Sequence, residues 1–400
     1  MVEEIKGFEL TPPEEIRARV MTLQRKMEKK GVDLALILQN VDIFYFSGTL
    51  QRGYLCIPQQ GEPVFFVQKY YDRAIAESPV QCVKAKGIKA LPGLFRDYGI
   101  KGTKVGLELD VIPVSLFDRI RDRFGGWEVL DISEEIKETR SIKSAFEIEQ
   151  IKRSGAIIDQ VFSAVKNHLQ EGMSEMELDG VLVSIGRATG HQGLLRMRGL
   201  NQEMMNIYVL SGANACAVSF GDTPLCGLGA THAVAQGSSA KRITRDEPIV
   251  IDYGGAYNGY ITDETRTFVI GRLKDHLERT YRIAQAIIDE VESEVRPGDL
   301  ATGIYERAKE MAIREGLGPY FMGHGEGQVA FVGHGLGLEI NEWPIIGRGF
   351  KRPLQPGMVF AFEPKFVFPN EGAVGIEVDY IVREDRLERI THFPTEIVAL

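Results

Sequence analysis

Five side chains in the second half of this 400-residue chain are of types that bind divalent metal ions. In chain order they are Asp252, Asp263, His334, Glu363 and Glu377. Carboxylates with one imidazole suit Mn, Fe, Co or Zn, and shared carboxylates can bridge two such ions. A metal-bound water loses its proton near neutral pH and becomes a nucleophile. The set predicts a hydrolase with two divalent ions, with Mn as the first expectation and Co, Fe or Zn as alternatives.

The two aspartates flank a hairpin signal. Asp252 ends an apolar run, and Asp263 follows the segment Gly-Gly-Ala-Tyr-Asn-Gly. A turn between Tyr257 and Asn258 would make them direct cross-strand partners, whereas a turn on Asn258 and Gly259 would make them diagonal neighbours. In both registers they share a face. Like charges on one face repel unless a cation neutralises them, so a metal site is favoured over two exposed aspartates.

Glu363 and Glu377 each interrupt an apolar strand-like run, and a hairpin loop is expected between them at 368–373. A buried carboxylate is costly, so two of them indicate metal ligation or tight pairing. His334 lies in the loop-like segment Gly-His-Gly-Leu-Gly-Leu, whose glycines would let the backbone approach a ligand. A single histidine in such a loop is more often structural, but the order of all five residues favours ligation.

Two domains are expected to position these residues, with a boundary near residue 140. In the segment 1–140, strand-like runs alternate with helical patterns, which predicts an α/β domain. The expected strands are 33–39, 43–48, 63–68, 104–110 and 127–133, and the expected helices are 13–30 and 114–124. The segment 141–400 is expected to be α+β, with a helix from about 144 to 170, a helix opening at Ser174, and a twisted antiparallel sheet.

The composition of the chain restricts which kinds of partner and which cellular location can be expected. The formal net charge of -9 argues against a nucleic-acid surface, which needs a basic stripe. No apolar run approaches the roughly 20 residues that a membrane span needs. The four cysteines form no CxxC motif, and the acidic stretch 1–15 lacks a signal-peptide pattern. We therefore expect a cytoplasmic protein with no nucleic-acid or membrane partner.

The segments around the five residues form a recognisable series. They read DYGGAYNGYITDETRTF, GHGLGLEINEWP, GMVFAFEP and GIEVDYIV. They resemble the signature blocks of the pita-bread metallohydrolases, a family that includes prolidase (Xaa-Pro dipeptidase), aminopeptidase P, methionine aminopeptidase and the metal-free creatinase. An N-terminal α/β domain of this size is similar to that of the prolidase, aminopeptidase P and creatinase branch. The resemblance implies a creatinase-type N-terminal domain, a pita-bread catalytic domain and a homodimer.

The resemblance also implies roles for the five residues. Asp252 would bind one metal ion, while Asp263 and Glu377 would bridge both ions. His334 and Glu363 would complete the shell of the other ion, and Glu363 would carry a proton to the leaving nitrogen. Because all five residues are present, a metal-free site of the creatinase type is a poor match.

Three positions concern the substrate. His232 fills the place of a family histidine that contacts substrate, although its link to Asp252 is longer than usual. Asn341 stands where the peptidases have a second histidine that binds the scissile carbonyl, and asparagine can donate a hydrogen bond but cannot titrate. Gly375 stands where proline-specific members tend to carry an arginine, so a charged anchor is lost.

The sequence thus predicts a dinuclear metallopeptidase that cleaves short Xaa-Pro peptides through a bridging hydroxide, with His232, Glu363 and Asn341 as catalytic residues. The alternative is a non-peptidase of the same family that acts on a small C–N or C–S compound, as the changes at Asn341 and Gly375 suggest. A third hypothesis, a catalytically silent member that binds a partner protein, predicts weak metal binding, and the five ligands argue against it.

Overall fold

The computed structural model describes residues 9–400, which form two compact units. The first unit ends at Arg140 and also includes Arg198–Asn201; the second comprises Ser141–Met197 and Gln202–Leu400. Residues 1–8, on which part of the expected cytoplasmic location depends, lie outside the described residues. Within residues 9–400, no helix is long and apolar enough to cross a membrane.

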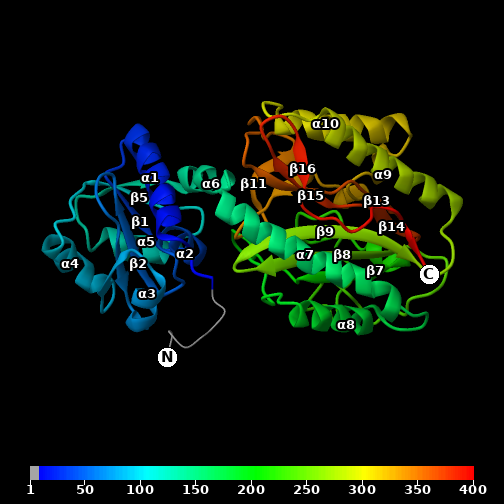
Figure 1. Cartoon of the computed structure of the whole chain (residues 1–400), viewed down its shortest axis with the longest axis horizontal. Helices are drawn as coiled ribbons and strands as arrows, with labels where there is room; N and C mark the ends of the chain where they lie inside the picture. Colours follow the sequence, from blue (N-terminus) through cyan, green and yellow to red (C-terminus); the bar gives the residue numbers. More distant parts are fainter. Residues whose placement is uncertain (1–8) are drawn as a thin grey trace. The chain divides into compact units, whose positions relative to one another are not determined.

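The first unit is built on one six-stranded sheet with the strand order β4-β3-β2-β1-β5-β6 (Figure 1). Its strands are β1 Leu34–Ile37, β2 Gly53–Pro58, β3 Val64–Val67, β4 Gln81–Lys84, β5 Lys104–Leu107 and β6 Glu128–Asp131. Its helices are α1 Pro13–Lys30, α2 Asn40–Ser47, α3 Tyr71–Glu77, α4 Leu91–Asp97, α5 Val114–Arg121 and α6 Ser133–Ser141. Strand β1 pairs antiparallel with β2 and parallel with β5, so the α/β sheet is mixed.

The structure corrects one predicted strand of this unit. The run 43–48 was expected to be a strand, but it lies in helix α2. The Gln39 side chain accepts a hydrogen bond from the Asp42 N–H and caps the helix, and Gly48, with a φ of 76°, ends it. A short apolar run fits a buried helix as well as a strand, so the capping residues decide.

The second unit contains two larger sheets and a two-stranded ribbon, rather than the single twisted sheet that the sequence predicts. The first sheet consists of β17 Val398–Ala399, β9 Tyr260–Val269, β8 Ile249–Tyr257 and β7 Ile207–Ser211. The second consists of β11 Glu342–Gly347, β10 Phe331–Gly335, β12 Val359–Phe362, β15 Val378–Val382 and β16 Leu387–Arg389. The ribbon pairs β13 Lys365–Phe368 with β14 Gly372–Gly375 around the predicted loop 368–373.

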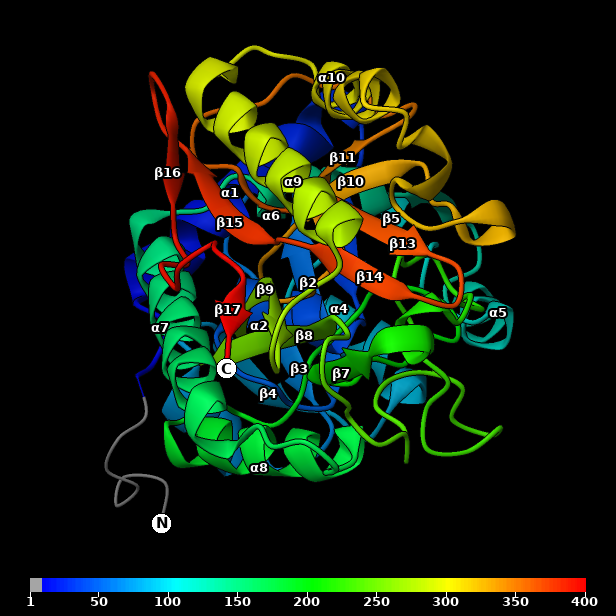
Figure 2. The ribbon, with the colours of Figure 1, turned by 90° about the vertical axis from the view of Figure 1, so that its right-hand side faces the viewer.

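Four long helices cover these strands on two sides (Figures 1 and 2). They are α7 Ala145–His168, α8 Glu175–Ala188, α9 Asp275–Glu294 and α10 Ala301–Arg314. Helices α7 and α8 each begin at a capping box, formed by Ser144 with Glu147 and by Ser174 with Glu177. The two helix starts predicted for this unit are confirmed.

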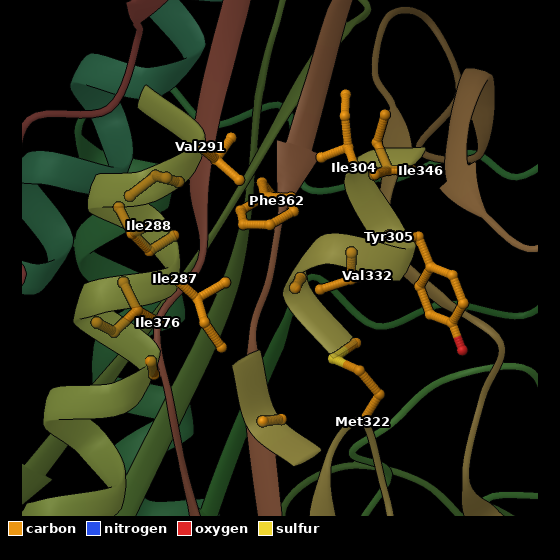
Figure 3. Packing of buried hydrophobic residues seen from close by; sticks show 14 of the residues in the cluster. Ile287, Ile288, Val291, Ile304, Tyr305, Met322, Val332, Ile346, Phe362 and Ile376 are labelled. Carbon is orange, nitrogen blue, oxygen red and sulfur yellow. The ribbon is translucent and has the colours of Figure 1, made fainter. Parts of the chain in front are cut away.

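Apolar side chains fix which face of the strands meets the helices. Figure 3 shows Ile287 of α9 in one cluster with Phe362 and Ile376 from the strand region. Because side chains alternate along a strand, the next residues, Glu363 and Glu377, point to the opposite face. The strands therefore present carboxylates on the side away from α9 and α10.

The same rule applies to the β8–β9 hairpin. Ile251 and Tyr253 are buried in a cluster with residues of α7 and α8. Asp252, between them in sequence, points away from those helices. The helix-covered cores thus orient both sets of predicted ligands toward the space between the strands.

Candidate metal centre

The β8–β9 hairpin turns on Asn258 and Gly259, whose φ values are 47° and 90°. In this register Gly254 pairs with Asp263, and Asp252 is its diagonal neighbour on the same face. Of the two registers left open by the sequence, the second is correct. The asparagine–glycine turn sets it, because both residues tolerate a positive φ.

Glu363 and Glu377 lie opposite each other between two antiparallel ladders. The flanking pairs are Phe362–Val378 and Lys365–Gly375. Both pairs belong to one register, which places Glu363 across from Glu377. Their side chains are 4% and 1% exposed, so water cannot screen these two carboxylates.

His334 lies in strand β10 and not in the loop that the sequence predicts. A Cβ at Gly333 would meet the Ala361 carbonyl oxygen at 2.3 Å, and one at Gly335 would meet the Trp343 carbonyl at 2.3 Å. The two glycines therefore let neighbouring strands approach His334 closely. Their role is in strand packing, whereas the sequence suggested an approach to a ligand.

Three of the predicted ligands, Asp263, His334 and Glu377, offer donor atoms that all lie within 4.8 Å of one another, and such a group could hold a divalent ion. His334 Nε2 lies 3.9 Å from Asp263 Oδ2, 3.9 Å from Glu363 Oε1 and 3.8 Å from Glu377 Oε1. An ion with bonds of about 2.1 Å fits between donors up to roughly 4.2 Å apart. Asp263 Oδ1 and Glu377 Oε1 are buried without a hydrogen-bond partner among residues 9–400. We call this position, formed by Asp263, His334 and Glu377 with Glu363 beside His334, the His334 side of the centre.

The other side of the centre holds a residue that the sequence analysis missed. Lys365 Nζ donates to Asp252 Oδ2 at 3.0 Å, Glu363 Oε2 at 2.7 Å and Glu377 Oε2 at 2.8 Å. We call this arrangement the Lys365 side. A signal was available in the sequence, because Lys365 follows Glu363 by two residues in an apolar segment and β-alternation places both on one face.

Electrostatics in the centre favour a cation. Burial raises the pKa of Asp263 well above its usual range, and the Glu377 and Asp252 carboxylates raise it further. Burial alone would lower the pKa of Lys365, but the carboxylates of Asp252, Glu363 and Glu377 outweigh it and hold this pKa well above its usual value. These contacts favour the ammonium form of Lys365, which hydrogen-bonds to the carboxylates of Asp252, Glu363 and Glu377.

Neighbouring side chains hold the ligands in place. Thr265 donates its hydroxyl hydrogen to Glu377 Oε2 at 2.6 Å, and the Asp263 N–H donates to Asp379 Oδ2 at 2.9 Å. Asp379 itself is fully buried. Such contacts orient ligands before an ion binds.

The predicted substrate residues lie in different environments. His232 is exposed in the turn that links Thr231 and Val234. Asn341 is half-buried directly before β11. The roles of His232 and Asn341 at the centre therefore stay predictions.

Gly375 leaves the space that Lys365 fills. A Cβ at position 375 would lie 2.7 Å from Lys365 Cγ and 2.8 Å from its Cα. We expect Gly375→Ala to destabilise the protein by about 1–3 kcal/mol through overpacking, measured by denaturant unfolding. Gly303→Ala in α10 is the control, since its Cβ would meet nothing within 4 Å. Equal stability of the two variants would contradict this account of Gly375.

Comparisons with known proteins match two family models to this chain. The model of Metallopeptidase family M24 matches residues 149–384, and that of the Creatinase/Prolidase N-terminal domain matches residues 19–142. The Xaa-Pro dipeptidase of Pyrococcus furiosus is 28% identical over 388 residues, which cover 96% of this chain and 100% of that protein.

Solved structures show the same architecture. The X-Pro aminopeptidase of Thermotoga maritima is 25% identical, with a TM-score of 0.79 over 95% of this chain and 99% of its own. The Xaa-Pro dipeptidase of Bacillus anthracis is 24% identical, with a TM-score of 0.82 over 96% and 100%, a likeness of fold alone. The predicted α/β N-terminal domain followed by an α+β pita-bread domain is confirmed.

Proposed function

Since the chain belongs to metallopeptidase family M24, we propose that it hydrolyses short peptides at Xaa-Pro bonds in a metal-dependent reaction. The observation that carries the proposal is the group of Asp263, His334 and Glu377, whose donor atoms lie within 4.8 Å of one another, with Glu363 Oε1 3.9 Å from His334 Nε2. A relative named Xaa-Pro dipeptidase matches nearly the whole chain and supports the choice of substrate.

Different residues of the chain would have different roles in such a reaction. A divalent ion on the His334 side would polarise the scissile carbonyl and activate a water molecule. Glu363 would carry a proton from the water to the leaving nitrogen, as the family resemblance implies. Its Oε1 lies 3.9 Å from His334 Nε2, and its Oε2 accepts a hydrogen bond from Lys365. Asn341 would donate a hydrogen bond to the carbonyl oxygen, and His232 would orient the substrate.

The predicted second ion conflicts with Lys365, whose ammonium lies on the side that Asp252 would serve. Manganese as the ion, a homodimer and a cytoplasmic location are further parts of the proposal. The carboxylate-rich ligand set supports manganese. Family analogy supports the dimer, and composition supports the location.

A substrate panel tests this function. Purified protein supplied with Mn²⁺ or Co²⁺ should release proline from at least one Xaa-Pro dipeptide or the first residue from an Xaa-Pro tripeptide. Treatment with a chelator should abolish the release, and added metal should restore it, because the donor set is built for a cation. Matched Xaa-Ala peptides are the control. No turnover of any Xaa-Pro peptide by metal-loaded protein would refute the proposal.

A second candidate function rests on Asn341 and the pair Lys365–Gly375, which change the surroundings of the metal ligands. These residues favour a hydrolase of the same family that acts on a small C–N or C–S compound. The triple variant Asn341→His, Lys365→Gly, Gly375→Arg tests it, since the arginine needs the space that Lys365 fills. Xaa-Pro cleavage by the variant but not by the wild type would favour this second function.

A further inference from the structure

Lys365 uses all of its hydrogen-bonding capacity within the predicted ligand set. An ammonium group has three donors, and each donates to a different carboxylate, those of Asp252, Glu363 and Glu377. The lysine side chain is 2% exposed. It is therefore a fixed member of the centre and not a surface lysine that reaches inward.

The two glutamates divide their oxygens between two cation positions. Oε2 of Glu363 and Oε2 of Glu377 accept from Lys365 Nζ, whereas their Oε1 atoms lie 3.9 and 3.8 Å from His334 Nε2. Both carboxylates thus bridge the Lys365 side and the His334 side. Carboxylates that bridge two metal ions share their oxygens in the same manner.

The backbone around Lys365 accommodates this arrangement. Lys365 and Gly375 are direct cross-strand partners, and any side chain at 375 would collide with Lys365. The glycine that sequence analysis interpreted as a lost anchor is therefore the residue that admits the lysine. Lys365, the first residue of β13, therefore supplies a positive charge beside Gly375.

The oxygens that remain available separate one ion from two. A second ion would need Oδ2 of Asp252 and the Oε2 atoms of Glu363 and Glu377, which already accept hydrogen bonds from Lys365 Nζ. A metal ion beside an ammonium group at that distance would be repelled strongly.

We propose that the ε-ammonium of Lys365 takes the place of one of the two metal ions, so that the centre binds a single divalent ion on the His334 side. Asp252 then serves the lysine and not a metal. The inference concerns the site of the proposed function, but the number of bound ions is measured without any substrate.

The wild-type protein provides the first test. Metal-free full-length protein is titrated with Mn²⁺ by calorimetry, and bound metal is counted by elemental analysis after dialysis. We expect one ion per chain and the resolved hyperfine lines of an isolated Mn²⁺ ion in the electron paramagnetic resonance spectrum. Two magnetically coupled ions per chain would overturn the proposal, and so would the absence of any bound ion.

Two variants and a control test the role of the lysine. Lys365→Ala removes both charge and bulk, and we expect it to bind two Mn²⁺ ions per chain; a count that stays at one would overturn the proposal. Lys365→Met keeps most of the bulk, and we expect it to bind one ion. In the control, Lys143→Ala, an equally buried lysine paired with Glu342 at 3.1 Å, the count should stay at one. A single wild-type ion without peptide hydrolysis would contradict only the proposed function.

Discussion

Replacing Glu377 with glutamine should lower kcat/KM for an Xaa-Pro peptide by at least about 10³-fold, because a bound metal contributes several kcal/mol of transition-state charge stabilisation. Oε2 of Glu377 accepts hydrogen bonds from Lys365 and Thr265, and its Oε1 faces His334. A neutral amide would place an N–H₂ group against a cation on one of these two sides. Kinetics and the bound-metal content of the same preparation should fall together.

The matched control for this variant is Glu388→Gln. Glu388 lies in β16, and it pairs with Lys152 and Arg383 at the surface. Exposed ion pairs contribute little, so the control should retain the wild-type rate and metal content. If Glu377→Gln bound metal as tightly as the wild type and kept its activity, Glu377 could not be a ligand of the centre.

Local signals allowed much of the catalytic unit to be predicted. The capping boxes at Ser144 and Ser174 determine helix starts through neighbouring residues alone, so sequence suffices there. The placement of Asp252 and Asp263 on one face follows from strand alternation and a nearby turn. The choice between their two registers depended on which turn residues adopt a positive φ, and this the sequence left open.

The features that the sequence missed depend on contacts between distant segments. Strand alternation places Lys365 on the same face as Glu363, but its contact with Asp252 spans more than a hundred residues of chain and has no local signal. Gly375 was interpreted as the loss of an anchor because its cross-strand partner was unknown. The register pairs Gly375 with Lys365. The two residues therefore act together, because the glycine leaves the space that the charged lysine side chain fills.

A second group of contacts near the predicted ligands involves Arg266 of β9, whose side chain is fully buried. It pairs with Glu264 and donates to the carbonyl oxygens of Glu377, Phe393 and Pro394 at 2.6, 2.6 and 2.7 Å. It thereby joins β9 to the backbone of a predicted ligand and to the C-terminal segment. The contact with the Glu377 carbonyl is buried, so water cannot readily replace the arginine donor there.

Arg266→Met should therefore lower the free energy of unfolding by about 3–5 kcal/mol, because it leaves the Glu264 carboxyl and several carbonyl oxygens without their donor. Burial raises the pKa of Glu264 to about 8 even beside Arg266, so this carboxyl can be protonated near neutral pH and much of the cost falls on the unpaired carbonyls. Denaturant unfolding measures the change. Arg383→Met, at the surface pair with Glu388, is the control and should cost at most about 1 kcal/mol. Equal losses in both variants would show that Arg266 does not hold this region together.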